Sequence, residues 1–279
     1  SSIMIFFKKA VGLLCVFMSL TLCSLGQQHN IWYFGDSAGI DFNSGNAVVL
    51  NNGSLLAYDN SSTICDSNGS LLFYTNGETV WNKNHAVMNN GTGLMGSSNS
   101  THGSVIVKKP NSNVYYLFTT PDFGGANGLR YNIIDMSLQG GLGEVTSKNN
   151  LLLGPVTEKC ASIRHQNGID TWIISHLWNS DKFYVYKIDS SGLNTNPVIS
   201  TIGSVHTGGK LGTYNSMGQM SSNVEGNKIA LAIYDLGHFE IFDFNKNNGM
   251  LSNNVVLSGF NKAWGVEFSF NGKYLYTTE

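Results

Sequence analysis

Short runs of alternating apolar and polar residues recur along the chain from about residue 30 onward. Such alternation favours β-strands, because it places apolar side chains on one face of each strand. The clearest runs read NVYYLFTT, DTWIISHLW, KFYVYKI, KIALAIYDL and HFEIFDF. Apolar positions at helical spacing are almost absent. The pattern therefore predicts an all-β protein.

Tight-turn sequences precede many of these runs. Glycine and asparagine supply the positive φ angles that hairpin turns require. Five turns of this kind lie at Gly69, residues 110–113, Gly168, Gly226 and Gly272. The strands are therefore expected to be joined as antiparallel hairpins.

A second marker repeats with a fixed spacing. Asp135, Asp189 and Asp243 each follow a strand-like run, precede a polar turn containing glycine, and lie 54 residues apart. Asp41 begins an N-terminal copy of the same half-unit. We interpret the aspartates as acceptors of backbone hydrogen bonds in equivalent turns.

Units of about 40 to 60 residues with four short antiparallel strands are typical of β-propeller blades. We predict a β-propeller with about five blades visible. The copy at Asp41 forms only the outer half of a unit, and the final KYLYTTE only an inner half. We expect the chain to be truncated from a larger ring of up to seven blades. A β-sandwich is the rival architecture, but it does not explain the 54-residue repeat.

The N-terminal residues predict export. Lys8 and Lys9 precede an apolar stretch at residues 10–22 and the small residues around Gly26, as in a secretory signal peptide. The stretch is too short to span a membrane. We therefore assign residues 1–26 to a signal peptide and 27–279 to one propeller domain, secreted or at the cell surface. Acylation at Cys23 is disfavoured by the bulky Leu22 before it.

The charge and the cysteines of the chain do not alter the prediction of a secreted propeller. Removing Lys8 and Lys9 shifts the net charge from −2 to −4, and no basic block indicates a nucleic acid or an anionic membrane as partner. Of the cysteines, only Cys65 and Cys160 follow the signal peptide. They could form a disulfide, but we favour two buried free thiols.

Several long phrases resemble the N-terminal propeller region of secreted proteins of gliding bacteria, which end in a type B sorting domain read by the type IX secretion system. They include NIWYFGDSAGIDFNSG, SNGSLLFYTNGETVWNKNHAVMNNGTGLMG and TEKCASIRHQNGIDTWIISHLWNSDKFYVY, and the resemblance covers nearly all of residues 30 to 279. It implies a propeller fold and surface placement, without any shared reaction. The C-terminal sorting domain is missing here.

Candidate catalytic chemistry is sparse. No acid pair, serine nucleophile elbow or phosphate-binding loop stands out. The oxygen-rich segment 243–249 lacks the distal glutamate of a calcium loop, and His165 and His176 lack further ligands at zinc spacing. We therefore expect no enzyme activity, no metal and no cofactor.

Aromatic and amide residues are the remaining candidates for a binding site. Trp81, Asn82 and His85 follow one strand-like run, and Trp178 and Asn179 follow another. We predict that they form a loop-borne platform for a ligand such as a sugar ring. The alternative is that the tryptophans wedge between blades.

These features predict a secreted or cell-surface propeller that serves as a non-enzymatic scaffold for binding or adhesion, as part of a larger type IX-secreted protein. Its expected partners are a glycan or protein ligand, and the secretion machinery through the missing C-terminal domain. The alternative is a secreted polysaccharide hydrolase or lyase with its site at the propeller mouth.

Overall fold

The computed structural model describes residues 27–208 and 214–279, so the predicted signal peptide lies outside the described residues. A three-stranded antiparallel sheet comes first, made of β1 (Ile31–Phe34), β2 (Ala38–Asp41) and β3 (Val48–Leu50). A two-stranded sheet comes last, made of β20 (Val266–Phe268) and β21 (Leu275–Thr277). Four units of four strands lie between them.

We name these units blades I to IV. Blade I contains β4 (Ser62–Cys65), β5 (Leu71–Thr75), β6 (Thr79–Asn82) and β7 (Val87–Thr92). Blade II contains β8 (Ser104–Lys108), β9 (Val114–Thr119), β10 (Leu129–Asp135) and β11 (Glu144–Leu153). Blade III contains β12 (Val156–Arg164), β13 (Thr171–Leu177), β14 (Ser180–Asp189) and β15 (Gly192–His206). Blade IV contains β16 (Met220–Ser222), β17 (Lys228–Ile233), β18 (His238–Phe244) and β19 (Leu251–Ser258).

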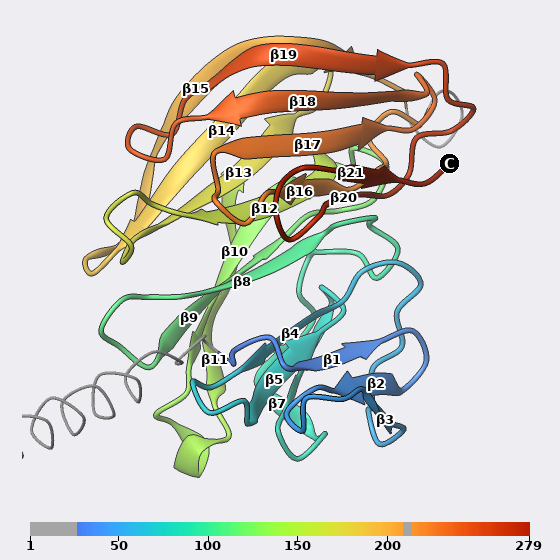
Figure 1. The fold of residues 1–279 in the computed structure, drawn as a ribbon. Helices are drawn as coiled ribbons and strands as arrows, with labels where there is room; N and C mark the ends of the chain where they lie inside the picture. The colour runs from blue at the N-terminus through green and yellow to red at the C-terminus, as the bar shows by residue number, and fades with distance from the viewer. Residues whose placement is uncertain (1–26, 209–213) are drawn as a thin grey trace, which may run out of the picture.

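The first strands of successive sheets, β4, β8, β12, β16 and β20, contact one another in that order, and we call them the inner strands. Figure 1 shows β1–β7 in its lower part, β12–β21 in its upper part, and blade II between them. The outer strands β7 and β11 also meet, through a parallel bridge between Asn89 and Glu144. In the described residues the only helical element is a short 3-10 turn at Gln139–Gly141. The predicted all-β propeller fold is confirmed.

Both sequence markers fall at equivalent places in the blades. The five predicted turns each join an inner strand to its neighbour. Asp135 and Asp189 end the third strands of their blades, and Asp243 is next to last in the third strand of blade IV. The carboxylates of Asp135 and Asp189 accept backbone hydrogen bonds from Ser137 and Ser191, whereas Asp243 binds Lys228 and Asn253. The repeat thus marks structurally equivalent positions, although only two of these three aspartates cap their turns.

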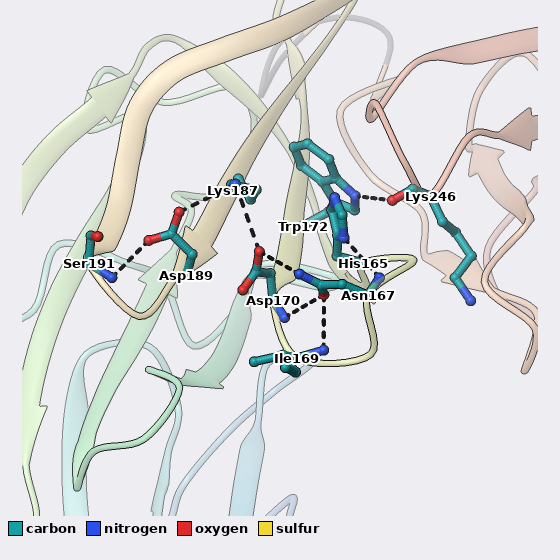
Figure 2. Close-up of polar contacts among 9 residues, drawn as sticks. All are labelled: His165, Asn167, Ile169, Asp170, Trp172, Lys187, Asp189, Ser191 and Lys246. Carbon is teal, nitrogen blue, oxygen red and sulfur yellow. Dashed lines mark hydrogen bonds and ion pairs between the residues drawn. The ribbon is translucent and has the colours of Figure 1, made fainter.

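Apolar side chains fill the space between neighbouring sheets. Phe73 of blade I meets Tyr115 of blade II edge-on, and Phe183 of blade III meets Phe242 of blade IV in the same way. Trp172 on β13 is buried at the junction of blades III and IV and donates its indole N–H to the carbonyl of Lys246 at 2.8 Å (Figure 2). Burying aromatic surface between sheets is what holds the blades together.

Two further expectations concern single features of the chain. Cys65 and Cys160 are both buried and both free, as favoured from the sequence. Burial raises the pKa of the Cys65 thiol to about 11 and that of Cys160 to about 12, so neither is a reactive thiolate near neutral pH. Across the described part of the chain, no helix has the length and apolar character needed to cross a membrane.

Candidate functional site

A cavity of about 300 Å³ lies along the inner strands, and we call it the axial channel. All five inner strands contribute to its wall. Hydroxyl groups recur there, from Ser62, Ser104, Ser162 and Ser221. Apolar side chains on the same strands turn into the cores between blades, as strand alternation requires. The wall of the channel combines hydrogen-bonding groups with apolar side chains, among them Ile64, Ile106 and Met220.

A carboxylate and a hydroxyl are paired in this wall. Ser221 on β16 donates its hydroxyl hydrogen to Glu267 on β20 at 2.9 Å. Both residues line the channel, and the Glu267 side chain is solvent-exposed. A carboxylate in this position can act as the acceptor of a proton from a bound water.

Gln219 lies next to this pair. Its side-chain oxygen accepts a hydrogen bond from the backbone N–H of Val266 at 3.1 Å. With the oxygen held in this way, the side-chain NH₂ is left as a donor, and Gln219 lines the channel. Glu267 on β20 and Gln219, just before β16, therefore combine a proton acceptor with a neutral hydrogen-bond donor.

His102 closes part of the same wall. The pKa of His102 is lowered to about 4, chiefly by burial, against a hydrogen bond to the backbone of Met220 that raises it. Its Nδ1 is buried and has no partner in the described part of the chain. The imidazole is therefore neutral at physiological pH, and it fixes β8 against β16 instead of carrying charge into the channel.

Glu158 and Lys159, two buried side chains on β12, hold blade III to its neighbours. Burial lowers the pKa of Lys159 to about 7. Glu158 accepts hydrogen bonds from the backbone N–H and the hydroxyl of Thr101, at 2.8 and 2.7 Å, and from the backbone N–H of Phe123 at 2.9 Å. Lys159 donates its ammonium to the carbonyls of Ser216 and Met217, at 2.9 and 2.8 Å. These bonds tie blade III to the segments that lead into blades II and IV.

Of the residues predicted as a binding platform, three lie together in blade I: Trp81 and Asn82 end strand β6 instead of lying on a loop, and His85 lies on the turn that follows. Trp81 is half-buried and stacks on Tyr74 with 5.6 Å between ring centroids. The His85 ring contacts Tyr74 OH at 3.1 Å and the amide of Asn52 at 3.0 Å. Asn82 is buried, and its side-chain oxygen accepts the backbone N–H of Asn84.

The other two lie on the loop between β13 and β14. Trp178 is 8% exposed, and the backbone of Gly124 from blade II packs directly on its ring. Asn179 is exposed, and its backbone N–H binds the carbonyl of His206. The two groups therefore belong to different blades, and neither lines the axial channel. Their role in ligand binding stays a prediction.

Sequence reasoning missed Gln219, Ser221 and Glu267. The residues that line the channel come from five inner strands spread over the whole chain, so no local motif joins them. Glu267 lies 46 residues after Ser221. Within residues 27–208 and 214–279, no cluster of three or more histidine, cysteine or acidic side chains could hold a metal ion.

Neither a protein-family model nor a curated protein matches this sequence. Solved structures do resemble its fold. A candidate 6-phosphogluconolactonase from Bacteroides fragilis has 13% sequence identity and a TM-score of 0.53, over 88% of this chain and 72% of the other. A candidate 6-phosphogluconolactonase from Bacteroides uniformis has 12% identity and a TM-score of 0.49, over 86% and 70%. Kluyveromyces lactis Hsv2p has 10% identity and a TM-score of 0.46, over 90% and 68%.

These similarities place the chain among the β-propellers. The predicted type IX-secreted adhesion scaffold is corrected by this finding, because the Bacteroides fragilis propeller is named as a candidate 6-phosphogluconolactonase. The prediction that the chain is not an enzyme, and its polysaccharide-cleaving alternative, stay predictions. Local sequence motifs do not reveal a site of this kind. The polar groups of a propeller channel come instead from strands far apart in sequence.

Proposed function

We propose that this propeller hydrolyses a small hydroxylated lactone or ester held in the axial channel. The observation that carries the proposal is the placement of Ser221 on β16, Gln219 just before it and Glu267 on the adjacent strand β20 around one cavity. The Bacteroides fragilis similarity supports only the fold, but the name of that propeller gives the first substrate class to assay.

The chemistry follows from the three side chains. The Glu267 carboxylate accepts a proton from a water molecule, whose oxygen attacks the carbonyl carbon of the substrate. The amide N–H of Gln219 donates to the carbonyl oxygen as negative charge develops on it. The bond between the carbonyl carbon and the ester oxygen then breaks, and the proton passes from Glu267 to the leaving oxygen. Ser221 orients the carboxylate.

The hydroxyl-rich wall suits the rest of such a substrate. Ser62, Ser104 and Ser162 come from three different inner strands and line the same cavity. Ser62 and Ser104 donate their hydroxyl hydrogens to the Ser104 carbonyl and to Asn60, so they offer acceptor oxygens to a polyol, whereas Ser162 can both donate and accept. A cavity of about 300 Å³ is at the small end of ligand pockets, which favours a molecule the size of one sugar ring.

The test is a hydrolysis assay on the purified chain, corrected for spontaneous hydrolysis, with sugar lactones, their phosphorylated forms and simple aryl esters. Glu267→Gln should lower kcat/KM by about 100-fold or more, because it removes the proton acceptor. Glu144→Gln is the matched control, since Glu144 lies on β11 outside the channel and should leave the rate unchanged. No turnover above background, or equal losses in both variants, would overturn the proposal.

Export stays a prediction from the sequence, supported by Lys8, Lys9 and the apolar residues 10–22. The resemblance to gliding-associated secreted propellers stays a prediction as well. Expressing the chain in a bacterium and sequencing the N-terminus of the protein recovered outside the cytoplasm tests export directly, with cleavage after Gly26 as the expected result.

A further inference from the structure

A second cavity of about 360 Å³ continues from the axial channel. The two share His29, Ile64, Ile106 and Ser162 in their walls. The second cavity adds Lys108 from the end of β8 and Arg164 from the end of β12. We call it the basic pocket. It lies at the end of the channel where the inner strands finish.

The basic pocket carries positive charge without compensation. Among the described residues, Lys108 and Arg164 are the only lysine, arginine or acidic side chains in its wall. The Arg164 guanidinium forms no hydrogen bond or ion pair with any residue that the structure describes. The Lys108 ammonium lies 5.9 Å from the ring centroid of Tyr115, a weak contact that leaves its charge unneutralised.

Acidic side chains on the elements around the pocket are engaged with other groups. Asp66, which lies near Tyr115, accepts the backbone N–H groups of Asn68 and Ser70. Figure 2 shows Asp170, on the loop that also carries Ile169 of the pocket wall, pointing toward Asn167 and Lys187. Its carboxylate is 2.9 Å from the Asn167 amide and 3.8 Å from the Lys187 ammonium. Glu225 shares a neighbouring crevice with Arg164, but its carboxylate accepts the amide of Asn227 at 3.0 Å.

We propose that the basic pocket binds the anionic group, a phosphate monoester or a carboxylate, of a small molecule whose hydroxylated body lies in the axial channel. A guanidinium presents paired N–H donors that match the oxygens of either group, and an arginine with no internal partner is free to make that contact. Thr171 and Gln28 add neutral donors to the same wall. The inference deepens the proposed function, on which it rests for the hydroxylated body, by naming the charge of the substrate.

The reaction and the binding of the anionic group are then carried out by different residues. Glu267 and Gln219 act on the carbonyl group, and Arg164 and Lys108 hold the charge at the other end. Because these sets share no residue, their failures can be told apart. Anion binding is measured without turnover, and turnover is measured on substrates with and without the anionic group.

Isothermal titration of the purified chain with glucose 6-phosphate, gluconate, inorganic phosphate and glucose tests the pocket. One of the two anionic sugars should bind at least about 10-fold more tightly than glucose, because a charge-assisted hydrogen bond is worth that much or more. Preference for glucose 6-phosphate assigns a phosphate, and preference for gluconate assigns a carboxylate. Inorganic phosphate should compete only in the first case.

Variants complete the test. Arg164→Gln should abolish the preference for the anionic sugar, whereas Lys83→Gln, on the exposed loop after β6, should leave it intact. Glu225→Gln should tighten anion binding, because it removes the one carboxylate that shares a crevice with Arg164. Circular dichroism confirms that each variant is folded.

If glucose and both anionic sugars bind equally well, or if Arg164→Gln keeps the preference for the anionic sugar, the basic pocket is not an anion site. This conclusion would hold even if Glu267 proves necessary for hydrolysis. The protein could bind the anionic sugar, lose that binding in Arg164→Gln, and yet hydrolyse no lactone. This result would support the basic pocket and contradict the proposed reaction.

Discussion

The imidazole rings of His176 and His206 stack within blade III, with 3.9 Å between their centroids and 17° between their planes. Both side chains are fully buried, and none of their four ring nitrogens has a hydrogen-bond partner among the described residues. Burial lowers the pKa of His176 to about 3 and that of His206 well below its usual value of 6.5. Two neutral histidines are therefore built into the core.

The stacked pair predicts a loss of stability in mild acid. The unfolded chain takes up protons on these histidines below pH 6.5, while the folded chain does not, so the free energy of unfolding falls as the pH drops. His102, with its pKa lowered to about 4, acts in the same direction. Each histidine contributes a slope of about 1.4 kcal/mol per pH unit between pH 6.5 and its folded pKa.

Urea unfolding followed by circular dichroism from pH 4.5 to 8 measures this slope. His206→Phe should have the wild-type free energy of unfolding at pH 8. In acid, its free energy of unfolding should fall less steeply, by the slope that one histidine contributes. A slope in the variant equal to that of the wild type would show that His206 is protonated in the folded state.

A second prediction concerns the ammonium of Lys159. It donates to the carbonyls of Ser216 and Met217 inside the protein, so Lys159→Met leaves those oxygens without a donor. We expect a loss of about 3 kcal/mol in the free energy of unfolding, because each buried orphan acceptor costs about 1 to 3 kcal/mol. Lys148→Met is the control, since the Lys148 ammonium binds the carbonyl of Thr92 at 2.8 Å in an exposed position.

The control should lose less than about 0.5 kcal/mol, because water replaces the lysine there. Chemical denaturation at one pH, with both variants beside the wild type, gives the comparison. Similar small losses in both variants would mean that water reaches the carbonyls of Ser216 and Met217.

The fold was predictable because its main determinants are local. A hairpin turn is specified by a few adjacent residues, as at Gly69 or Gly168, and the 54-residue spacing of Asp135, Asp189 and Asp243 recorded one blade per repeat. Each of these features acts within a single sheet, so the sequence pattern was enough to identify it.

The candidate site was not predictable in the same way. Glu158 and Lys159 lie inside a strand-like run, where charged residues ordinarily face solvent, yet both are buried. Their partners Thr101 and Ser216 are 57 residues away on either side and belong to other blades. Trp172 packs between blades III and IV, but the residues next to it in the sequence do not distinguish it from Trp178. Its role could therefore not be predicted from the sequence.

Trp172 gives a third prediction. Trp172→Phe keeps an aromatic ring between blades III and IV but removes the indole donor to the Lys246 carbonyl. The expected loss is about 1 to 2 kcal/mol, because the hydrogen bond is largely buried. Trp32→Phe is the matched control, since the Trp32 indole donates to the carbonyl of His29 at the same 2.8 Å while the side chain is 51% exposed. Thermal unfolding that ranks Trp32→Phe as the more damaging change would contradict this assignment.

The last prediction uses two glycines with nearly the same backbone conformation. Gly124 has φ of +66° and Gly140 has φ of +64°, so alanine at either position carries a similar backbone cost of about 1 kcal/mol. A Cβ at Gly124 would lie 2.6 Å from the Trp178 ring, whereas a Cβ at Gly140 would have no atom within 4 Å. Gly124→Ala should therefore destabilise the protein by about 1 to 3 kcal/mol more than Gly140→Ala. The difference between their urea midpoints, converted with a common m-value, isolates the contact between the blade II loop and Trp178. Equal midpoints would show that Trp178 moves freely out of the way, and the ring would then be available to a ligand after all.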